Sequence, residues 1–283
     1  MARRVIINDG LTKTLFEGDD AANAIVYFKD DIAAKGDDAV QTLTGKGVLT
    51  NRVSAHIMTR IEEVGVPTHF IKQLNMREQL VRRVEVIGLE VMVRNVAAGS
   101  LCERLNVKEG TILNQPIFEI YAKHENGART LINDYHAIER GIVDPFELED
   151  ITYMSMRVND FLNGMFAGVH MRLVDFNIEF GRIYGEYGEV YLLLADEISP
   201  DNCRIWDIKS DDRLGRDRVN AQGEVLIDGY QEVAQRLGII EKDLVQGGHV
   251  NEKIASELEG IENELARARR LRSVSRGGQP RKI

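Results

Sequence analysis

Residues 173–206 constrain the fold of this chain more than any other stretch. Their first part alternates between apolar and polar side chains with a period of two, which predicts an extended strand with two different faces. The apolar face holds Val174, Phe176, Ile178 and Phe180, and the polar face holds Asp175, Asn177 and Glu179. Two carboxylates therefore project from one surface of the predicted strand, on either side of Asn177.

A second strand is predicted to return antiparallel after the Gly-rich turn at residues 185–189. Its apolar residues, 190–195, lead directly to Asp196 and Glu197, and Arg204 follows shortly after. Because like charges this close raise one another's pKa, the hairpin favours a bound magnesium ion or another cation among its carboxylates. The alternative is a half-solvated sheet whose acidic face contacts only water, and the pattern alone does not separate the two.

The composition is that of an ordinary globular protein. Of the 283 residues, 43% are hydrophobic and 29% are charged, and no apolar run approaches the roughly 20 residues of a membrane span. The formal net charge is -9, and residues 266–283 are basic without any acid, so the rest of the chain is still more acidic. Cys102 and Cys203 have no metal-binding spacing. We therefore expect a cytoplasmic protein with neither a membrane nor a nucleic-acid partner.

The remaining pattern alternates between short strands and amphipathic helices. Strands are expected at residues 5–7, 13–17, 24–29, 69–71, 79–86, 89–96 and 117–122. Helices are expected at residues 46–64, 100–105, 147–169 and 223–237. Beyond residue 248, a narrow apolar stripe predicts one more helix that docks or pairs, followed after residue 273 by a disordered basic tail.

Residues 89–105 combine a strand with the start of a helix. Glu90 and Arg94 fall on one face of the strand, and Ser100 with Glu103 fits a capping box. A helix N-terminus presents free N–H groups, so together with Arg94 it forms a candidate phosphate site. Taken alone, the same segment is also compatible with a capped helix that binds no ligand.

Four segments together resemble the SAICAR synthetases, the ligases of purine biosynthesis. They are EVMVRNVAAGS at 90–100, LVDFNIEFG at 173–181, ADEISPDNCRIWD at 195–207 and NMREQLVRR at 75–83. The resemblance runs from about residue 8 to about residue 238, and its motifs agree in order and spacing. It implies a two-domain α+β fold related to the ATP-grasp group, with antiparallel sheets, packed helices and a nucleotide between the domains.

On this resemblance we expect three regions in the chain. Residues 1–86 would form a β-rich domain that covers the nucleotide, and residues 87–240 a larger α+β domain with the metal and ribotide sites. Residues 241–283 would form the C-terminal helix and the basic tail.

The resemblance also implies a reaction and its residues. Carboxyaminoimidazole ribonucleotide and L-aspartate would be joined through an acyl phosphate, with ATP and Mg2+ as cofactors, to give SAICAR, ADP and phosphate. Asp175, Glu179 and Asp196 are the implied catalytic residues. The implied binding roles are the ATP-bound metal for Glu179 and Asp196, the substrate-side metal for Asp175 and Glu90, the ribotide phosphate for Arg94, Ser100 and Arg204, and the nucleotide for Lys13 and Lys123.

Three departures from the family pattern lie where charge is handled. Leu11 replaces a lysine of the first turn, Asn177 replaces a lysine of the acidic strand, and the loop at 123–129 lacks the usual Asp-Pro pair. Each lost charge-assisted contact removes about 1.5 to 3 kcal/mol, although Arg129 is a candidate for replacing a lost cation.

These departures leave two alternatives to the family reaction. One is a paralogue that acts on another phosphorylated ribotide, and the other is a nucleotide-binding regulatory protein without ligase activity. The sequence is compatible with a homo-oligomer but does not fix the oligomeric state.

Overall fold

The computed structural model describes residues 4–33, 40–124 and 127–240 of the chain. Contacts between Cα atoms divide the chain into two units, with the boundary between Ile239 and Ile240. The helix expected beyond residue 248 and the basic tail lie outside the described residues. Within the described residues, no helix combines the length and the apolar composition needed to cross a membrane.

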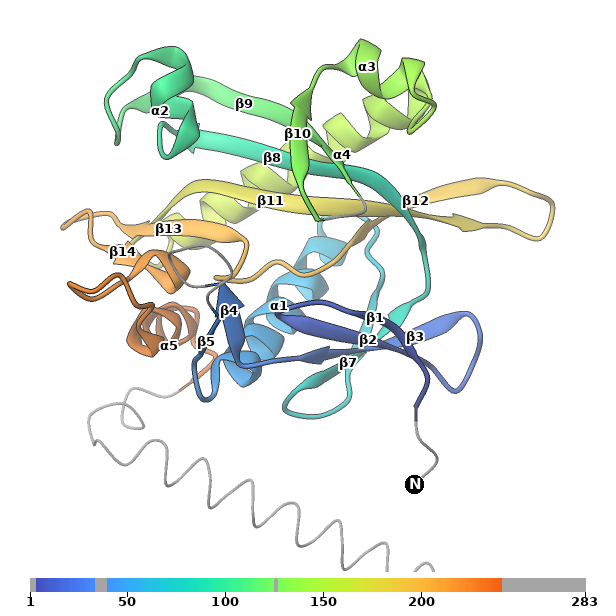
Figure 1. Cartoon of the computed structure of the whole chain (residues 1–283), viewed down its shortest axis with the longest axis horizontal. Coiled ribbons are helices and arrows are strands. Elements are labelled where there is room, and N and C mark those ends of the chain that lie inside the picture. The colour runs from blue at the N-terminus through green and yellow to red at the C-terminus, as the bar shows by residue number, and fades with distance from the viewer. Residues whose placement is uncertain (1–3, 34–39, 125–126, 241–283) are drawn as a thin grey trace, which may run out of the picture. The chain divides into compact units, whose positions relative to one another are not determined.

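The first sheet holds five antiparallel strands from the N-terminal part of the chain (Figure 1). In sheet order they are β1 (Ile6–Asp9), β2 (Lys13–Glu17), β3 (Asn23–Phe28), β7 (Glu78–Arg82) and β6 (Phe70–Gln73). A separate pair, β4 (Asp31–Ala33) and β5 (Val40–Thr42), precedes helix α1 (Lys46–Glu63). Helix α1 packs against β3, β6 and β7, and its Val53, Ile57 and Ile61 are fully buried. The helix expected at 46–64 is thus confirmed, because its apolar residues recur every four positions on one side.

The second sheet holds seven antiparallel strands, and the long strand β11 lies at its centre (Figure 1). The strands are β8 (Glu85–Val96), β9 (Ile112–Lys123), β10 (Arg129–Ile132), β11 (Met171–Tyr184), β12 (Val190–Ala195), β13 (Cys203–Asp207) and β14 (Arg213–Leu214). Their order is β10-β9-β8-β11-β13-β14, and β12 also pairs with β11. Helix α4 (Pro145–Ala167) packs against β8, β11 and β12.

Four short elements complete the fold. They are helix α2 (Ser100–Leu105), helix α3 (Asp134–Glu139), the 3-10 turn η1 (Gly215–Asp217) and helix α5 (Ile227–Arg236). Helix α5 packs against α1 and against η1, so it links the end of the second sheet to the helix that covers the first.

The hairpin predicted from the alternating sequence is confirmed. Val174, Phe176, Ile178 and Phe180 are at most 1% exposed, and α4 packs against the strand that carries them. Strand β12 returns antiparallel, with Ala195 opposite Glu179. The acids that follow β12 therefore lie beside the acids of β11.

Several boundaries differ from the prediction, and two of the differences have a clear structural cause. The strand expected at 79–86 is two strands, because β7 ends at Arg82 in the first sheet and β8 begins at Glu85 in the second. The helix expected from residue 223 begins only at Ile227, because Val219 and Val225 form an isolated antiparallel bridge before it.

Candidate active site

One face of the seven-stranded sheet collects the charged residues that the sequence singled out. Asp175 of β11 lies opposite Arg94 of β8, and Glu179 lies opposite Glu90. Glu90 in turn lies opposite Tyr121 of β9. Residues directly opposite one another in antiparallel strands share a face of the sheet, so the register places these side chains together.

Asp175 lies between two arginines at one end of this face. Its Oδ2 atom accepts hydrogen bonds from Arg94 Nη1 at 3.1 Å and from Arg204 Nη1 at 2.9 Å. The same guanidinium groups reach further acids, since Arg94 Nε donates to Glu119 at 2.7 Å and Arg204 Nε donates to Asp217 at 2.6 Å. Burial raises the pKa of Asp175, and the attraction of Arg204 and Arg94 opposes that rise. The cluster therefore presents two fixed guanidinium groups.

The backbone between β8 and α2 runs past these arginines. Gly99 has φ 56° and ψ -137°, a conformation that favours glycine, and an added Cβ would lie 3.4 Å from Arg204 Nη1. Gly99 takes the N-cap position of α2, so Ser100 is already helical and no side-chain capping bond forms. The expected capping box of Ser100 and Glu103 is therefore wrong. Ser100 is exposed, and it directly follows the glycine that lies beside Arg204.

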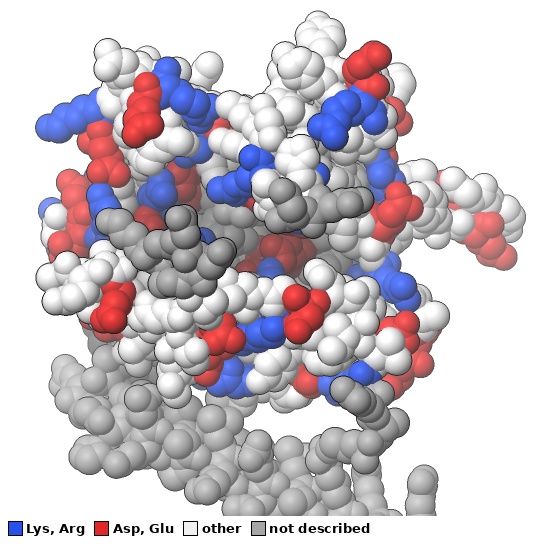
Figure 2. Space-filling model, viewed as in Figure 1, with Lys and Arg blue, Asp and Glu red and all other residues white. Residues whose placement is uncertain are grey.

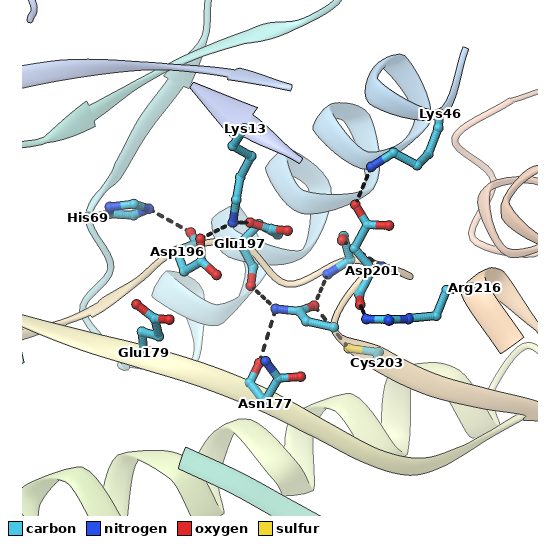
Figure 3. Close-up of polar contacts among 12 residues, drawn as sticks. Lys13, Lys46, His69, Asn177, Glu179, Asp196, Glu197, Asp201, Cys203 and Arg216 are labelled. Atoms are coloured by element: carbon cyan, nitrogen blue, oxygen red, sulfur yellow. Dashed lines mark hydrogen bonds and ion pairs between the residues drawn. The ribbon is translucent and has the colours of Figure 1, made fainter. Parts of the chain in front are cut away.

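A second cluster joins the two sheets. Lys13 of β2, in the five-stranded sheet, contacts the carboxylates of Asp196 and Glu197, which follow β12 (Figure 3). Glu179 lies nearby on β11, and its Oε1 atom accepts a hydrogen bond from Lys123 Nζ at 2.6 Å. Burial raises the pKa of Glu179, and the charge of Asp196 raises it further. Additional positive charge between these carboxylates would therefore be stabilising.

His69 fixes the backbone of Asp196, a contact that the sequence did not reveal. Its Nε2 atom donates to the main-chain oxygen of Asp196 at 2.8 Å, and Asp196 holds a left-handed φ of 62°. The Nε2 atom must carry the proton, because a carbonyl oxygen only accepts. Burial lowers the pKa of His69 to about 4, so the ring is neutral at physiological pH. Nothing local marks this histidine, since its partner lies 127 positions away.

Glu197 ends the predicted hairpin, but the family resemblance implies no binding role for it. It is 3% exposed and shares Lys13 with Asp196. Its position directly after Asp196 was the available signal, because the two acids end the same apolar strand.

A cavity of about 400 Å3 opens between the two sheets. Charged and polar groups, among them Lys13, Glu179 and Asp196, form part of its lining, together with Arg82 and Arg83. Apolar side chains line much of the remaining wall: Leu15, Ala24, Val26, Phe28, Val81, Val84 and Val86. Figure 2 shows acidic and basic atoms inside a hollow on this side of the molecule. The lining suits a ligand with an apolar ring system at one end and an anionic group at the other.

Magnesium fits one acid cluster better than the other. This ion commonly binds one or two carboxylates and takes its other ligands from phosphate and water, a set that Glu179 and Asp196 match. Glu179 and Asp196 each pair with one lysine and keep 18% and 28% of their side chains exposed, whereas Asp175 is held between two arginines and is only 7% exposed. Glu90 contacts Arg129 and is 11% exposed. Among the described residues, no group of three or more acidic, histidine or cysteine side chains is arranged to hold an ion. A magnesium ion here would therefore need oxygen ligands from a bound nucleotide.

The three departures from the family pattern occupy different surroundings. Leu11 lies in the turn between β1 and β2 and is 41% exposed. Asn177 lies between the two acids of β11, and its backbone pairs with Asn202 at 3.0 and 3.1 Å. Arg129, at the start of β10, reaches across β9 to Glu90.

The family model of the SAICAR synthetases matches residues 6–237 of this chain. The chain belongs to the SAICAR synthetase family. A phosphoribosylaminoimidazole-succinocarboxamide synthase from Rhodospirillum centenum is 47% identical over 240 residues, which cover 85% of this chain and 94% of the relative.

Solved SAICAR synthetase structures share the fold. The structure of the synthase from Ehrlichia chaffeensis matches with a TM-score of 0.78 and 36% identity, over 84% of this chain and 100% of that one. A SAICAR synthetase in complex with ADP matches with a TM-score of 0.76 and 36% identity, over 82% and 97%. The α+β fold expected for this SAICAR synthetase family member is thereby confirmed.

Proposed function

We propose that this chain ligates carboxyaminoimidazole ribonucleotide with L-aspartate at the expense of ATP, in the de novo synthesis of purines in the cytoplasm. One observation carries the proposal. The chain belongs to the SAICAR synthetase family, and its cavity brings Lys13 to the acids that follow β12. Arg94 and Arg204 lie on the face of the seven-stranded sheet that also carries Glu179.

The chemistry requires both clusters. A carboxylate is a poor electrophile, so ATP first transfers its terminal phosphoryl group to the ribotide carboxylate, which gives an acyl phosphate and ADP. The amine of aspartate then attacks the acyl carbon, an amide bond forms, and phosphate leaves. Fixed cations stabilise the charge that develops on the oxygens during both steps.

The cavity is the proposed nucleotide site. Its apolar wall would contact the base, and Lys13 and Lys123 would contact the phosphates near Glu179 and Asp196. When bound there, Mg2+ would neutralise phosphate oxygens between the two carboxylates. The complex of a 36% identical SAICAR synthetase with ADP supports a nucleotide in this family.

The arginine pair is the proposed ribotide phosphate site. Arg204 keeps 28% of its side-chain surface exposed, and the exposed Ser100 follows Gly99 beside it, so both can donate to a phosphate. Asp175 and Glu90 would hold a substrate-side ion only if their arginines turned toward substrate.

We also propose the domain division near residue 86 and the relationship to ATP-grasp proteins. The strands of the five-stranded sheet all end by Arg82, and β8, which begins at Glu85, opens the seven-stranded sheet. We further propose that the chain associates into a homo-oligomer.

The test is direct assay of the purified protein with the ribotide, aspartate, ATP and magnesium, following the succinocarboxamide product and ADP together. We expect turnover at about 1 to 1,000 per second. Lys13→Met should abolish most of this turnover, whereas Lys72→Met, at an exposed position of β6, should not.

Binding of ATP without formation of product would reject the proposed ligase activity. A rise in the melting temperature with ATP but not with the ribotide would indicate a different substrate, because any ligand of the native state stabilises it.

A further inference from the structure

The acidic face of the seven-stranded sheet carries its cations at fixed places. Arg94 and Arg204 share Asp175, and Lys123 pairs with Glu179. At the centre of this face, between the two acids of β11, stands the uncharged Asn177. A substrate carboxylate that approached this face near Glu90 and Glu179 would be repelled unless a further cation faced it there.

Arg129 is such a cation, and it comes from a different strand. Its Nη1 atom contacts Glu90 Oε1, and its guanidinium lies over the ring of Tyr121 at 5.4 Å from the centroid. The Tyr121 ring is itself held, since its hydroxyl donates to Glu119 at 3.0 Å and accepts from Arg94 Nη2 at 3.3 Å. Stacking on a fixed ring and an ion pair together restrict where the guanidinium lies.

Arg129 is also more exposed than the other cations named above on this face. Its side chain is 47% exposed, against 40% for Lys123, 28% for Arg204 and 5% for Arg94. Its contact with Glu90 uses one Nη atom, and a guanidinium carries further N–H donors in a planar fork that matches a carboxylate.

We propose that Arg129 binds a carboxylate of a substrate in the ligation, which places the cation on β10 instead of on β11 at position 177. This role rests on the proposed function, in which both the ribotide and aspartate carry carboxylates. Glu90 and Tyr121 are then positioning residues, because they hold the guanidinium and do not themselves need to touch the substrate.

Kinetics of Arg129→Gln and Arg129→Lys test the assignment. We expect Arg129→Gln to raise KM for one carboxylate substrate about 10- to 100-fold, with an intermediate rise for Arg129→Lys, and to change kcat and KM for ATP much less. Arg213→Gln is the matched control, because Arg213 is 52% exposed, pairs with Glu109 and lies on β14. This control should leave all constants near those of the wild type.

The substrate whose KM rises shows which substrate carries the carboxylate that Arg129 binds. If KM rises for the ribotide, Arg129 holds the carboxylate that becomes the acyl group. If KM rises for aspartate, alanine and β-alanine, which each lack one carboxylate, show which one is held. The amine that lacks the recognised group should react equally slowly with the wild type and with Arg129→Gln.

The double variant Arg129→Gln, Asn177→Lys distinguishes binding from support of Glu90. Returning a cation to the centre of the face should recover part of the lost affinity, whereas a role limited to holding Glu90 predicts no recovery. Equal loss of kcat and of affinity for all three substrates, or an unchanged KM for both carboxylate substrates, would overturn the proposal.

Calorimetric titration of the same variants with ribotide and with aspartate tests the Arg129 assignment independently of turnover. If the wild type binds a carboxylate substrate but makes no product, the proposed ligase fails while the Arg129 assignment is still decided by dissociation constants. If Arg129→Gln binds both substrates as the wild type does, the assignment fails even in an active ligase.

Discussion

At the scale of single residues, the site consists of acids whose counter-charges come from other strands. Asp175 of β11 is held by guanidinium groups from β8 and β13, and Asp196 by an ammonium group from the other sheet. Because Asp175 is buried, removal of one of its arginines would leave its charge only partly compensated, which costs more than the pair itself contributes.

Substitution of His69 tests whether the position of the Asp196 backbone matters apart from the charges of the site. We expect His69→Ala to lower the free energy of unfolding by about 1 to 3 kcal/mol, because the carbonyl of Asp196 loses its donor in a buried place. It should also lower kcat/KM for ATP, whereas His69→Gln, which keeps a donor, should retain more of both. Thermal melts and ATP kinetics measure this, with His56→Gln on α1 as control. Equal effects of Ala and Gln would show that the ring's volume matters rather than its hydrogen bond.

Restoring lysine at the two substituted positions tests what those substitutions changed. Leu11 is 41% exposed in its turn, so Leu11→Lys can point at a bound phosphate without disturbing the core. We expect this change to lower KM for ATP about tenfold, the size of a charge-assisted contact. Asn177→Lys should add less, because Arg129 already faces the same side of the sheet. Steady-state kinetics of both single variants and of the double variant measure these effects. If neither variant is a better enzyme than the wild type, other substitutions have the larger effect on activity.

At the scale of elements, the start of α4 is fastened to β11. Asp144 and Glu147 form a capping box with Pro145 at the first helical turn. The side chain of Arg182 on β11 donates to Glu147 Oε2 at 2.8 Å. The helix that covers the sheet is therefore aligned with the strand that carries the acids.

This fastening predicts a specific dependence on pH. The hydrogen bond from Arg182 holds the pKa of Glu147 below its ordinary value of 4.5. The resulting stability is complete above pH 4.5 and is lost as the pH falls through the lowered pKa. We expect the difference in melting temperature between the wild type and Glu147→Gln to be constant near neutrality and to shrink in acid. Glu149→Gln, at an exposed position of the same helix, should show no such trend.

At the scale of the whole molecule, the site depends on contacts between the two sheets. Besides Lys13, the fully buried Lys46 of α1 donates to Asp201 at 2.7 Å, and Tyr230 of α5 donates to the same carboxylate at 2.5 Å. Asp201 follows the acids that end β12, so three distant parts of the chain hold that segment.

Trp206 should report ligand binding across this arrangement. It is the only tryptophan, it is 5% exposed, and it packs with Val96 and Ala98 just before Gly99. We expect the ribotide to change its fluorescence, since the ligand would bind at Gly99 and Arg204, whereas ATP alone should change it much less. Fluorescence titration with each ligand measures this, and an equal response to ATP would place the nucleotide near β13 instead.

The sequence by itself determined the features whose pattern lies within a short stretch of residues. The alternation in β11, the return of β12, helix α1 and the acids at 175, 179 and 196 could be predicted because the signal for each lies within a few residues. The family followed from motifs of the same local kind, and the family match confirmed it.

Only the tertiary structure decided which groups meet. Arg129 with Glu90, His69 with Asp196 and Lys13 with Glu197 join residues that are 39, 127 and 184 positions apart, so no local pattern contains them. The bounds of α2 were predicted correctly, but its capping box was not, because Gly99 takes the N-cap position beside Arg204 and Ser100 is already helical. Strand order and register set these distances, and they are properties of the packed sheets rather than of any one segment.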